Sequence, residues 1–156
     1  MHFITKSFKE LTIDELYELL QLRIEVFVVE QTCYYQDLDD KDRHPGAQHL
    51  LGYHDGRLAG YLRTLPRGVS YPEYQSIGRV VTSDAVRGQG TGHQLLEEGV
   101  ALCLAQDAEL AIKISAQEHL QGYYGRQGFV TVSDVYQEDG IDHVAMVRAP
   151  QQLISQ

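Results

Sequence analysis

The segment 80–96 constrains the fold of this chain more than any other part of the sequence. It begins with a β-branched stretch, passes through the turn RGQGTG at 87–92, and continues into an amphipathic helical pattern. Glycine lacks a Cβ, so the backbone N–H groups of such a turn can approach a ligand closely. The first N–H groups of a helix lack intrahelical partners and carry a partial positive charge. The sequence therefore predicts a strand, a phosphate-binding turn and a helix in that order, with Arg87 as an added cation.

Two common classes of phosphate-binding loop do not fit this turn. The chain lacks Gly-x-x-x-x-Gly-Lys-Ser/Thr, so it has no Walker A loop and a kinase-like site is disfavoured. It also lacks Gly-x-Gly-x-x-Gly after its first predicted strand, which disfavours a dinucleotide site. The pattern that it does have, Arg-x-x-Gly-x-Gly, is short, and a glycine-rich helix start without a ligand would match it as well.

Length and composition predict one cytoplasmic domain. The chain has 156 residues, which suits a single domain over residues 1–150 followed by a tail at 151–156. Its net charge of −9 argues against nucleic acid as a partner. No apolar run of about 18 residues and no signal core occur, so neither a membrane span nor export is expected. The two cysteines and the scattered histidines lack metal-ligand spacing, so no metal is expected, and so few cysteines fit a reducing compartment.

Periodicity along the chain predicts an α/β fold with a mixed sheet. A capping box at Thr12 starts the first helix, and strand-like runs on both sides of Asp55-Gly56 and of residues 138–140 predict two hairpins. The order β-α-β-β-β-α-β-α-β-β combines antiparallel hairpins with one right-handed parallel crossover. The expected strands are 3–8, 48–54, 57–64, 74–82, 109–116, 129–136 and 141–148, and the expected helices are 13–30, 90–106 and 118–127.

The glycine turn resembles motif A of the GNAT superfamily of N-acetyltransferases, whose pattern is Gln/Arg-x-x-Gly-x-Gly/Ala. A second segment at 117–129, which reads QEHLQGYYGRQGF, resembles motif B of the same superfamily. That motif has Asn or Gln at a strand end, followed by Phe/Tyr-Tyr-x-x-x-Gly-Phe. The two motifs occur in the expected order, separated by one predicted helix and one predicted strand. The resemblance covers nearly the whole chain and implies the GNAT acyl-CoA N-acyltransferase fold.

A third segment resembles one branch of this superfamily. Residues 22–37 read LRIEVFVVEQTCYYQD, and the ElaA-like branch carries Leu-Arg-x-x-Val-Phe-Val-Val-Glu-Gln followed by an acidic loop. Acyl-homoserine-lactone synthases share a looser form of this segment, but they are typically longer and have a tryptophan after it. This chain has no tryptophan, which favours the ElaA-like branch. Helix packing alone would also explain Phe27 and its valine neighbours.

The resemblance implies that acetyl-CoA binds along the strand and the glycine turn. It assigns the pyrophosphate to six consecutive backbone N–H groups, those of Arg87, Gly88, Gln89, Gly90, Thr91 and Gly92. It places the pantetheine arm beside the end of the preceding strand, where its amides can pair with the backbone of Val80, Val81 and Thr82. Gln117 corresponds to a position that often holds an Asn in contact with the same arm.

Tyr124 matches the general acid of the superfamily and is also expected to contact the cofactor. A phenol with a pKa of about 10 is protonated at neutral pH and can donate its proton to a departing thiolate. Its neighbour Tyr123 is expected to point elsewhere on the helix. A buried tyrosine with a satisfied hydroxyl would give the same sequence.

The sequence leaves three alternatives open for how the acceptor amine loses its proton. Many members of the superfamily carry a carboxylate on the strand before the glycine turn, but residues 74–79 read YQSIGR, with only Glu73 at the margin. A carboxylate within 30–42, a water molecule, or an amine that arrives neutral would each meet the need. Arg79 either orients an acceptor or pairs with an acidic neighbour, and His143 starts the last strand near the expected acceptor side.

The sequence thus predicts an N-acetyltransferase that uses acetyl-CoA as co-substrate and transfers the acetyl group directly to a primary amine. The amine belongs to a small molecule or a peptide, and its site is expected among the end of the first helix, the acidic loop and the last hairpin. The polar segment after the first helix supplies the expected contacts Gln31, Tyr35 and Asp39. A homodimer is compatible with these expectations. The alternative is a CoA-binding module without efficient turnover, because the same glycine turn would serve both functions.

Overall fold

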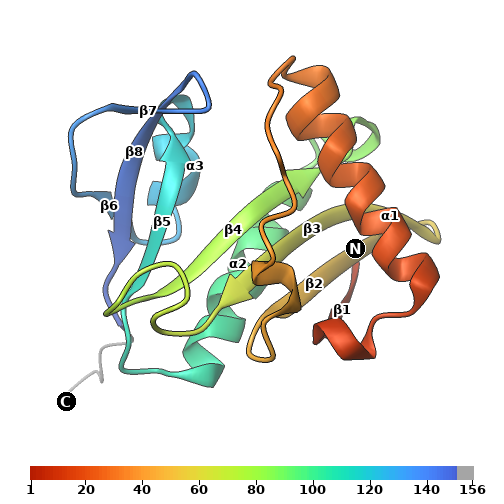
Figure 1. Cartoon of the computed structure of the whole chain (residues 1–156), viewed down its shortest axis with the longest axis horizontal. Helices are drawn as coiled ribbons and strands as arrows, with labels where there is room; N and C mark the ends of the chain where they lie inside the picture. The colour runs from red at the N-terminus through yellow and green to blue at the C-terminus, as the bar shows by residue number, and fades with distance from the viewer. Residues whose placement is uncertain (151–156) are drawn as a thin grey trace.

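The computed structural model describes residues 1–150, in which eight strands form one sheet and helices cover both of its faces (Figure 1). The strands are β1 (His2–Lys6), β2 (Gln48–His54), β3 (Arg57–Leu65), β4 (Gln75–Thr82), β5 (Ile112–Gln117), β6 (Phe129–Thr131), β7 (Tyr136–Glu138) and β8 (Ile141–Arg148). The α-helices are α1 (Ile13–Ile24), α2 (Thr91–Gln106) and α3 (Gln121–Gly125). The predicted mixed α/β class is confirmed. The predicted tail at 151–156 lies outside the described residues.

The sheet divides at its centre. Its strand order is β1-β2-β3-β4-β5-β8-β6, with β7 also paired to β8. Strands β4 and β5 run parallel and are joined by the crossover through α2. Their pairing covers two residue pairs, Gln75 with Ile112 and Ser76 with Lys113. Beyond these pairs the two strands diverge toward the C-terminal end of β4, as Figure 1 shows.

A β-bulge lies in β4 close to the point of divergence. The register between β3 and β4 shifts between Tyr61 and Arg63, and the backbone of Arg79 has a φ of 54°. A left-handed conformation is uncommon for a residue with a Cβ, and an extra residue in one strand bends that strand locally. The bulge therefore helps to turn the end of β4 away from β5.

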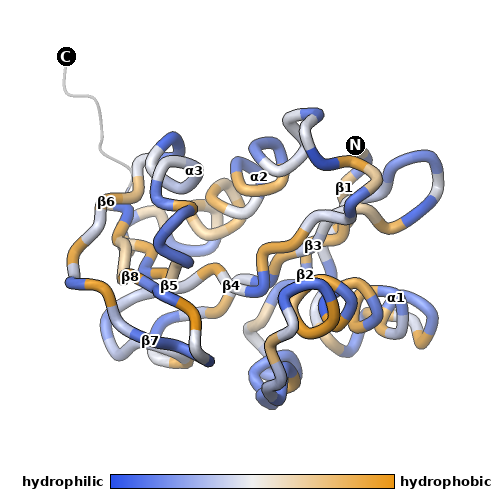
Figure 2. Tube along the Cα trace, turned by 90° about the horizontal axis from the view of Figure 1, so that it is seen from above, coloured by the Kyte–Doolittle hydropathy of each residue, from blue (hydrophilic) through white to orange (hydrophobic). Residues whose placement is uncertain are grey.

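The sheet separates two apolar clusters. Neighbouring residues of a strand point to opposite faces, so Leu50 packs under α2 while Leu51 packs under α1. Figure 2 shows α1 and α2 on opposite sides of the sheet. On α2, Gly99 approaches β3 so closely that a Cβ at this position would lie 2.6 Å from Cδ2 of Leu62. In residues 1–150, every helix is too short or too polar to cross a membrane.

The first predicted helix changes its geometry after Ile24. The capping box forms as expected, because Oγ1 of Thr12 accepts from the Glu15 amide and the Glu15 carboxylate accepts from the Thr12 amide. An α-helix up to residue 30 is wrong, since Glu25–Glu30 form a π-helix, with the amide of Gln31 donating to the Val26 carbonyl at 3.3 Å. Valines at 26, 28 and 29 weaken a regular α-helix here because β-branched side chains crowd the preceding turn.

The predicted strand 129–136 is also wrong in its middle, where it divides into β6 and β7. The hydroxyl of Ser133 accepts from the Ala145 amide at 2.8 Å and takes the place of a backbone acceptor on the partner strand. A serine side chain that competes for a backbone group in this way ends regular pairing. Two smaller differences are that β5 begins at Ile112 and that 118–127 contains a 3-10 turn, Glu118–Leu120, before the short α3.

Candidate active site

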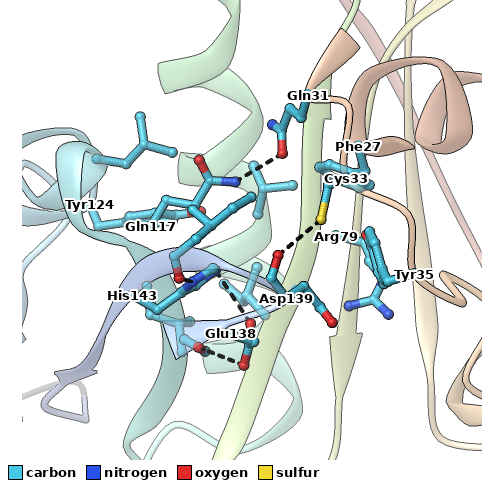
Figure 3. A pocket seen from close by; sticks show the side chains of 17 residues that line it. Phe27, Gln31, Cys33, Tyr35, Arg79, Gln117, Tyr124, Glu138, Asp139 and His143 are labelled. Carbon is cyan, nitrogen blue, oxygen red and sulfur yellow. Dashed lines mark hydrogen bonds and ion pairs between the residues drawn. The ribbon is translucent and has the colours of Figure 1, made fainter. Parts of the chain in front are cut away.

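Two adjoining cavities occupy the opening between β4 and β5. The first, called the turn cavity, has a volume of about 190 Å³ and is lined by Val80, Val81, Thr82, Gly92, Leu120, Tyr123 and Tyr124. The second, called the hairpin cavity, has a volume of about 130 Å³ and lies between the π-helix end, β5 and the β7–β8 hairpin (Figure 3). The side chains of Val80, Leu120 and Tyr124 line both cavities. An elongated ligand can therefore run from the glycine turn past Tyr124 into the hairpin cavity.

The glycine turn leads directly from β4 into α2. Gly88 and Gly90 have φ values of 82° and 76°, which glycine adopts without a steric penalty. The hydroxyl of Thr91 donates to the carbonyl of Val86 at 3.0 Å and closes the turn. Among residues 1–150, no backbone acceptor pairs with the amides of Gly88, Gln89 and Gly90, and the first amides of α2 add to these donors. The turn thus presents a row of N–H groups to an anion.

Arg87 lies at the start of this turn and contacts three oxygen atoms. Its Nη2 lies 2.9 Å from the Glu30 carboxylate and 3.0 Å from the Thr82 carbonyl, and its Nη1 lies 3.4 Å from Asp84. Both Arg87 and Glu30 are more than a third exposed, and ion pairs of this kind are worth about 0–1 kcal/mol. A phosphate group can therefore compete with Glu30 for the guanidinium.

Tyr124 stands where the two cavities meet. The residue is 8% exposed, and its ring packs edge to face on Phe129 and Tyr123. Burial raises the pKa of Tyr124 far above its ordinary value, because no charged group or hydrogen bond within the described chain compensates the phenolate. The hydroxyl is therefore protonated at neutral pH and can act as a proton donor. The neighbouring hydroxyl of Tyr123 instead donates to the Gly92 carbonyl at 2.6 Å and ties α3 to α2.

Residues from both sides of the opening meet above the hairpin cavity. At the end of β5, Nε2 of Gln117 donates to Oε1 of Gln31 at 3.3 Å, and Figure 3 shows this bond across the gap. Gln31 and Tyr35 line the hairpin cavity, together with the bulge residue Arg79. Asp39, the third predicted acceptor contact, does not line this cavity and belongs to an ion-pair network behind Tyr35 and Arg79.

This network joins three arginines to three aspartates. Arg23 on α1 is fully buried, so its charge requires partners inside the protein. Of the two roles open for Arg79, the structure shows pairing with acidic neighbours. The network also orients Tyr35, whose hydroxyl donates to Asp37 at 2.9 Å. Its six ion pairs are Arg23–Asp37 (2.8 Å), Arg23–Asp42 (2.8 Å), Arg63–Asp39 (2.7 Å), Arg63–Asp42 (2.9 Å), Arg79–Asp37 (2.8 Å) and Arg79–Asp39 (3.4 Å).

The network makes stability depend on pH in the acid range. Burial alone raises the pKa of Asp39, but the hydrogen bond from Arg63 and the charges of Arg63 and Arg79 outweigh burial and lower it to about 2. An unfolded Asp has a pKa of about 3.9, so the carboxylate stabilises the fold fully above that pH and loses this effect as the pH falls toward 2. We expect Asp39→Asn to lower Tm at neutral pH and to flatten the decline of Tm between about pH 4 and pH 2.

Thermal melts across this pH range test the expectation. Asp40→Asn is the matched control, because the Asp40 side chain is 88% exposed and contacts only Arg43, at 3.7 Å, among the ion pairs of residues 1–150. An Asp39→Asn profile that is parallel to those of the wild type and of the control would contradict the role given to the network.

The β7–β8 hairpin lines the hairpin cavity, on the acceptor side where the sequence predicts the last hairpin to lie. Cys33 contacts this hairpin through its Sγ, which lies 3.2 Å from the Asp139 carbonyl, and this contact closes one side of the hairpin cavity. Glu138 and His143 also line the cavity. The sequence signal that brings Glu138 and His143 together is the turn Asp139-Gly140. A two-residue hairpin loop places residue 138 opposite residue 141 and residue 136 opposite residue 143. In residues 1–150, no three His, Cys, Asp or Glu side chains are grouped to hold a metal ion.

Comparisons with known proteins agree with this geometry. Residues 12–149 match the family described as "Acetyltransferase (GNAT) domain". Protein ElaA of Escherichia coli K12 is 42% identical over 139 residues, which cover 89% of this chain and 90% of that protein.

Two solved structures are also similar to this chain. The crystal structure of Escherichia coli ElaA matches with a TM-score of 0.88 and 39% identity, covering 94% of this chain and 98% of that one. An acyl-CoA N-acyltransferase from Pseudomonas aeruginosa matches with a TM-score of 0.89 and 49% identity, covering 95% and 99% of the two chains. The divided sheet, the glycine turn, Tyr124 and these matches establish that the chain belongs to the GNAT acetyltransferase family and is ElaA-like.

Proposed function

We propose that this chain transfers the acetyl group of acetyl-CoA directly to a primary amine. One observation carries the proposal: the two cavities meet at the side chain of Tyr124, which is buried and whose hydroxyl is protonated at neutral pH. One cavity begins at a turn suited to phosphate, and the other has room for a second substrate. Both substrates can therefore be present at once, with the reacting atoms beside Tyr124, and no covalent intermediate on the protein is required.

The residues present fit acetyl-CoA, which would supply the acyl thioester. The free amides of Gly88, Gln89 and Gly90 and the N-terminus of α2 would bind the pyrophosphate, with Arg87 as a cation beside it. Within residues 1–150, the edge of β4 that faces β5 has no strand partner beyond Ser76. The backbone of residues 80–82 can therefore pair with the amides of the pantetheine arm as an added strand would. Gln117 would contact the same arm from the end of β5.

Proton transfer follows from the position of Tyr124. A thiolate that leaves an acyl group needs a proton, and the hydroxyl of Tyr124 would donate it to the sulfur atom. On the acceptor side, Gln31 and Tyr35 line the hairpin cavity and would contact the amine, and Asp39 would act through Arg79. The acceptor class remains a small molecule or a peptide with a primary amine, and the cytoplasm is the compartment that the cysteine content favours.

A CoA-binding module without efficient turnover is the second candidate function. It is favoured by one observation, that β4 carries no carboxylate over Gln75–Thr82, where many relatives in the superfamily place a base. Acyl-CoA binding alone would use the same turn and the same strand edge.

A panel of amines with acetyl-CoA and a thiol reagent separates the two functions. We expect at least one primary amine to accelerate release of CoA thiol, with one N-acetylated product per thiol, detected by mass spectrometry. The background from the protein is low because both cysteines, Cys33 and Cys103, are buried. Tight CoA binding by calorimetry, with no amine raising the rate above spontaneous hydrolysis, would leave the binding module as the function.

A further inference from the structure

We propose that Glu138 and His143 on the β7–β8 hairpin bind the acceptor as an ammonium ion and that His143 removes one of its protons. The acceptor is then a primary amine that is cationic when it binds and has no carboxylate near the amine. This inference rests on the proposed acetyl transfer and supplies the base that β4 lacks. In the hairpin cavity, Glu138 would bind the positively charged amine and His143 would act as the base.

The two side chains form an oriented pair at the edge of the cavity. Oε2 of Glu138 lies 3.3 Å from Nε2 of His143, while Oε1 of Glu138 accepts from Ser115 at 3.2 Å. Tyr136, whose hydroxyl bonds to Ser115, also stacks on the imidazole of His143. Figure 3 shows Glu138 and His143 next to each other below Gln117. Both ends of the carboxylate and one face of the imidazole are therefore held in place.

The tautomer of His143 is fixed by its other nitrogen. Nδ1 lies 2.8 Å from the carbonyl oxygen of Ile141, which can only accept a hydrogen bond. Nδ1 therefore carries the hydrogen, and in the neutral ring Nε2 has a free lone pair. That lone pair points to the side of Glu138, where it would repel the carboxylate unless a proton lies between them. Because Nε2 and Oε2 are 3.3 Å apart, this proton is one carried by Nε2 itself, and we infer that His143 takes it from an ammonium bound to Glu138.

Sheet register places this pair within the acceptor side of the site. His143 lies opposite Gln117 on β5 and opposite Tyr136 on β7, so the three residues form one row across three strands. Side chains of directly opposed residues project from the same face of a sheet. Because Gln117 and Tyr124 line the same cavity as His143, an amine held by the pair lies on the side of the thioester that is opposite to the glycine turn.

The charges around the cavity favour a cation. Arg79 is the arginine that lines it, and its charge belongs to the network in which three arginines match three aspartates. Lys113 on β5 lies over the ring of Tyr71 at 4.9 Å and forms no ion pair within residues 1–150. Glu138 and Asp139 thus give the cavity an excess of negative charge when His143 is neutral, and the chain as a whole carries −9. An acceptor whose own carboxylate lies within a few carbon atoms of the amine would be repelled.

The proposed step begins with a protonated amine. The ammonium binds Glu138, and one of its protons moves to Nε2 of neutral His143, which leaves a lone pair on the amine nitrogen. The nitrogen attacks the thioester carbonyl, so a C–N bond forms and the C–S bond breaks with its electron pair on sulfur. Sulfur takes the proton of Tyr124, the second amine proton restores Tyr124, and the first leaves His143 for solvent.

The test uses three amines of matched length and two pairs of variants. Butylamine and 1,4-diaminobutane carry cations only, whereas 4-aminobutyrate carries a carboxylate. Glu138→Gln and His143→Gln remove the two roles, and Glu138 tolerates replacement because its side chain is 49% exposed. The controls are His54→Gln, from the exposed pair His54–Asp55 at 3.4 Å, and Asp142→Asn, beside His143 on β8.

Two readouts are expected to support the proposal. In the CoA complex, the two cations should shift the imidazole ¹⁵N resonances of His143 but not those of His54, and Glu138→Gln should weaken this binding about tenfold or more. In turnover, His143→Gln should lower kcat by about 10²-fold with the KM for acetyl-CoA unchanged, and both controls should match the wild type. The wild type should also prefer the two cations to 4-aminobutyrate.

Different results would overturn the ammonium site and the role of His143 as base. Cations that leave His143 unshifted at saturation, or that bind Glu138→Gln as tightly as the wild type, would overturn the ammonium site whether or not acetyl transfer occurs. A folded His143→Gln protein with unchanged kcat would overturn the role of His143 as base. Calorimetry of the wild type with acetyl-CoA is run in parallel. If the wild type does not bind acetyl-CoA, the proposed acetyl transfer is contradicted, and this outcome is separate from a failure of the ammonium site.

Discussion

Tyr124→Phe is expected to lower kcat by about 10³-fold, within the 10²–10⁴-fold that general acid catalysis typically contributes, or roughly 3–5 kcal/mol of barrier. The change removes one hydroxyl that makes no hydrogen bond within the described chain and keeps the ring that packs on Phe129. The thermal melt should therefore hardly change. Steady-state kinetics with acetyl-CoA and a turned-over amine measures the effect, and the KM for acetyl-CoA should stay close to that of the wild type.

Tyr123→Phe is the matched control for this experiment. Its hydroxyl bonds to the Gly92 carbonyl at 2.6 Å, so its loss should loosen the contact between α3 and the first turn of α2. We expect a moderate rise in the KM for acetyl-CoA and a small change in kcat. If Tyr124→Phe retains the wild-type kcat while chemistry limits the rate, Tyr124 is not the proton donor. If both variants lose CoA binding, the two tyrosines are structural.

Gly92→Asp is expected to weaken CoA binding by about 10²-fold or more, because like charges about 4 Å apart near a protein surface repel by about 4 kcal/mol before screening by salt. A Cβ at Gly92 would lie 3.6 Å from the Tyr123 ring and 3.9 Å from Thr82, which are ordinary contacts. An aspartate in the first turn of a helix also stabilises that helix. The fold should therefore persist while calorimetry shows that CoA binding is largely lost.

Gly92→Asn separates charge from size at the same position. It has nearly the same volume as the aspartate and no charge, so it should bind CoA at least tenfold more tightly than Gly92→Asp. Gly90→Asp is expected to lose CoA binding as well, but its φ of 76° adds backbone strain, so Gly92 is the better site for the comparison. Equal affinities of the Asp and Asn variants and the wild type would place the phosphate-binding site elsewhere.

The elements around the glycine turn could be predicted because their signals are local. The turn at 87–92 follows a β-branched strand and precedes an apolar helical stripe, and α2 begins at Thr91, one residue from the predicted start. The hairpin around Asp55-Gly56 was equally readable, since β2 and β3 end within one residue of their predicted bounds. In both cases glycines with positive φ fix the turn without help from distant residues.

The segments that meet at the hairpin cavity could be predicted, but the contacts that shape it could not, because distant residues form them. The contact between Cys33 and Asp139 joins residues that are 106 positions apart, and no local pattern encodes it. Arg23 and Arg63 interrupt the apolar patterns of α1 and β3, yet they are buried because Asp37, Asp39 and Asp42 reach them from a loop. The sequence therefore suggested Asp39 as an acceptor contact, whereas the structure places it in the network.

A nuclear Overhauser experiment with acetyl-CoA labelled with ¹³C at its acetyl methyl group tests most directly where the thioester lies. Under saturating conditions without an amine, the methyl protons should show contacts to the ring of Tyr124 and to the methyl groups of Val80, because these side chains line both cavities where they meet. Contacts to residues outside the opening between β4 and β5, with none to Tyr124 or Val80, would contradict the site and the transfer mechanism built on it.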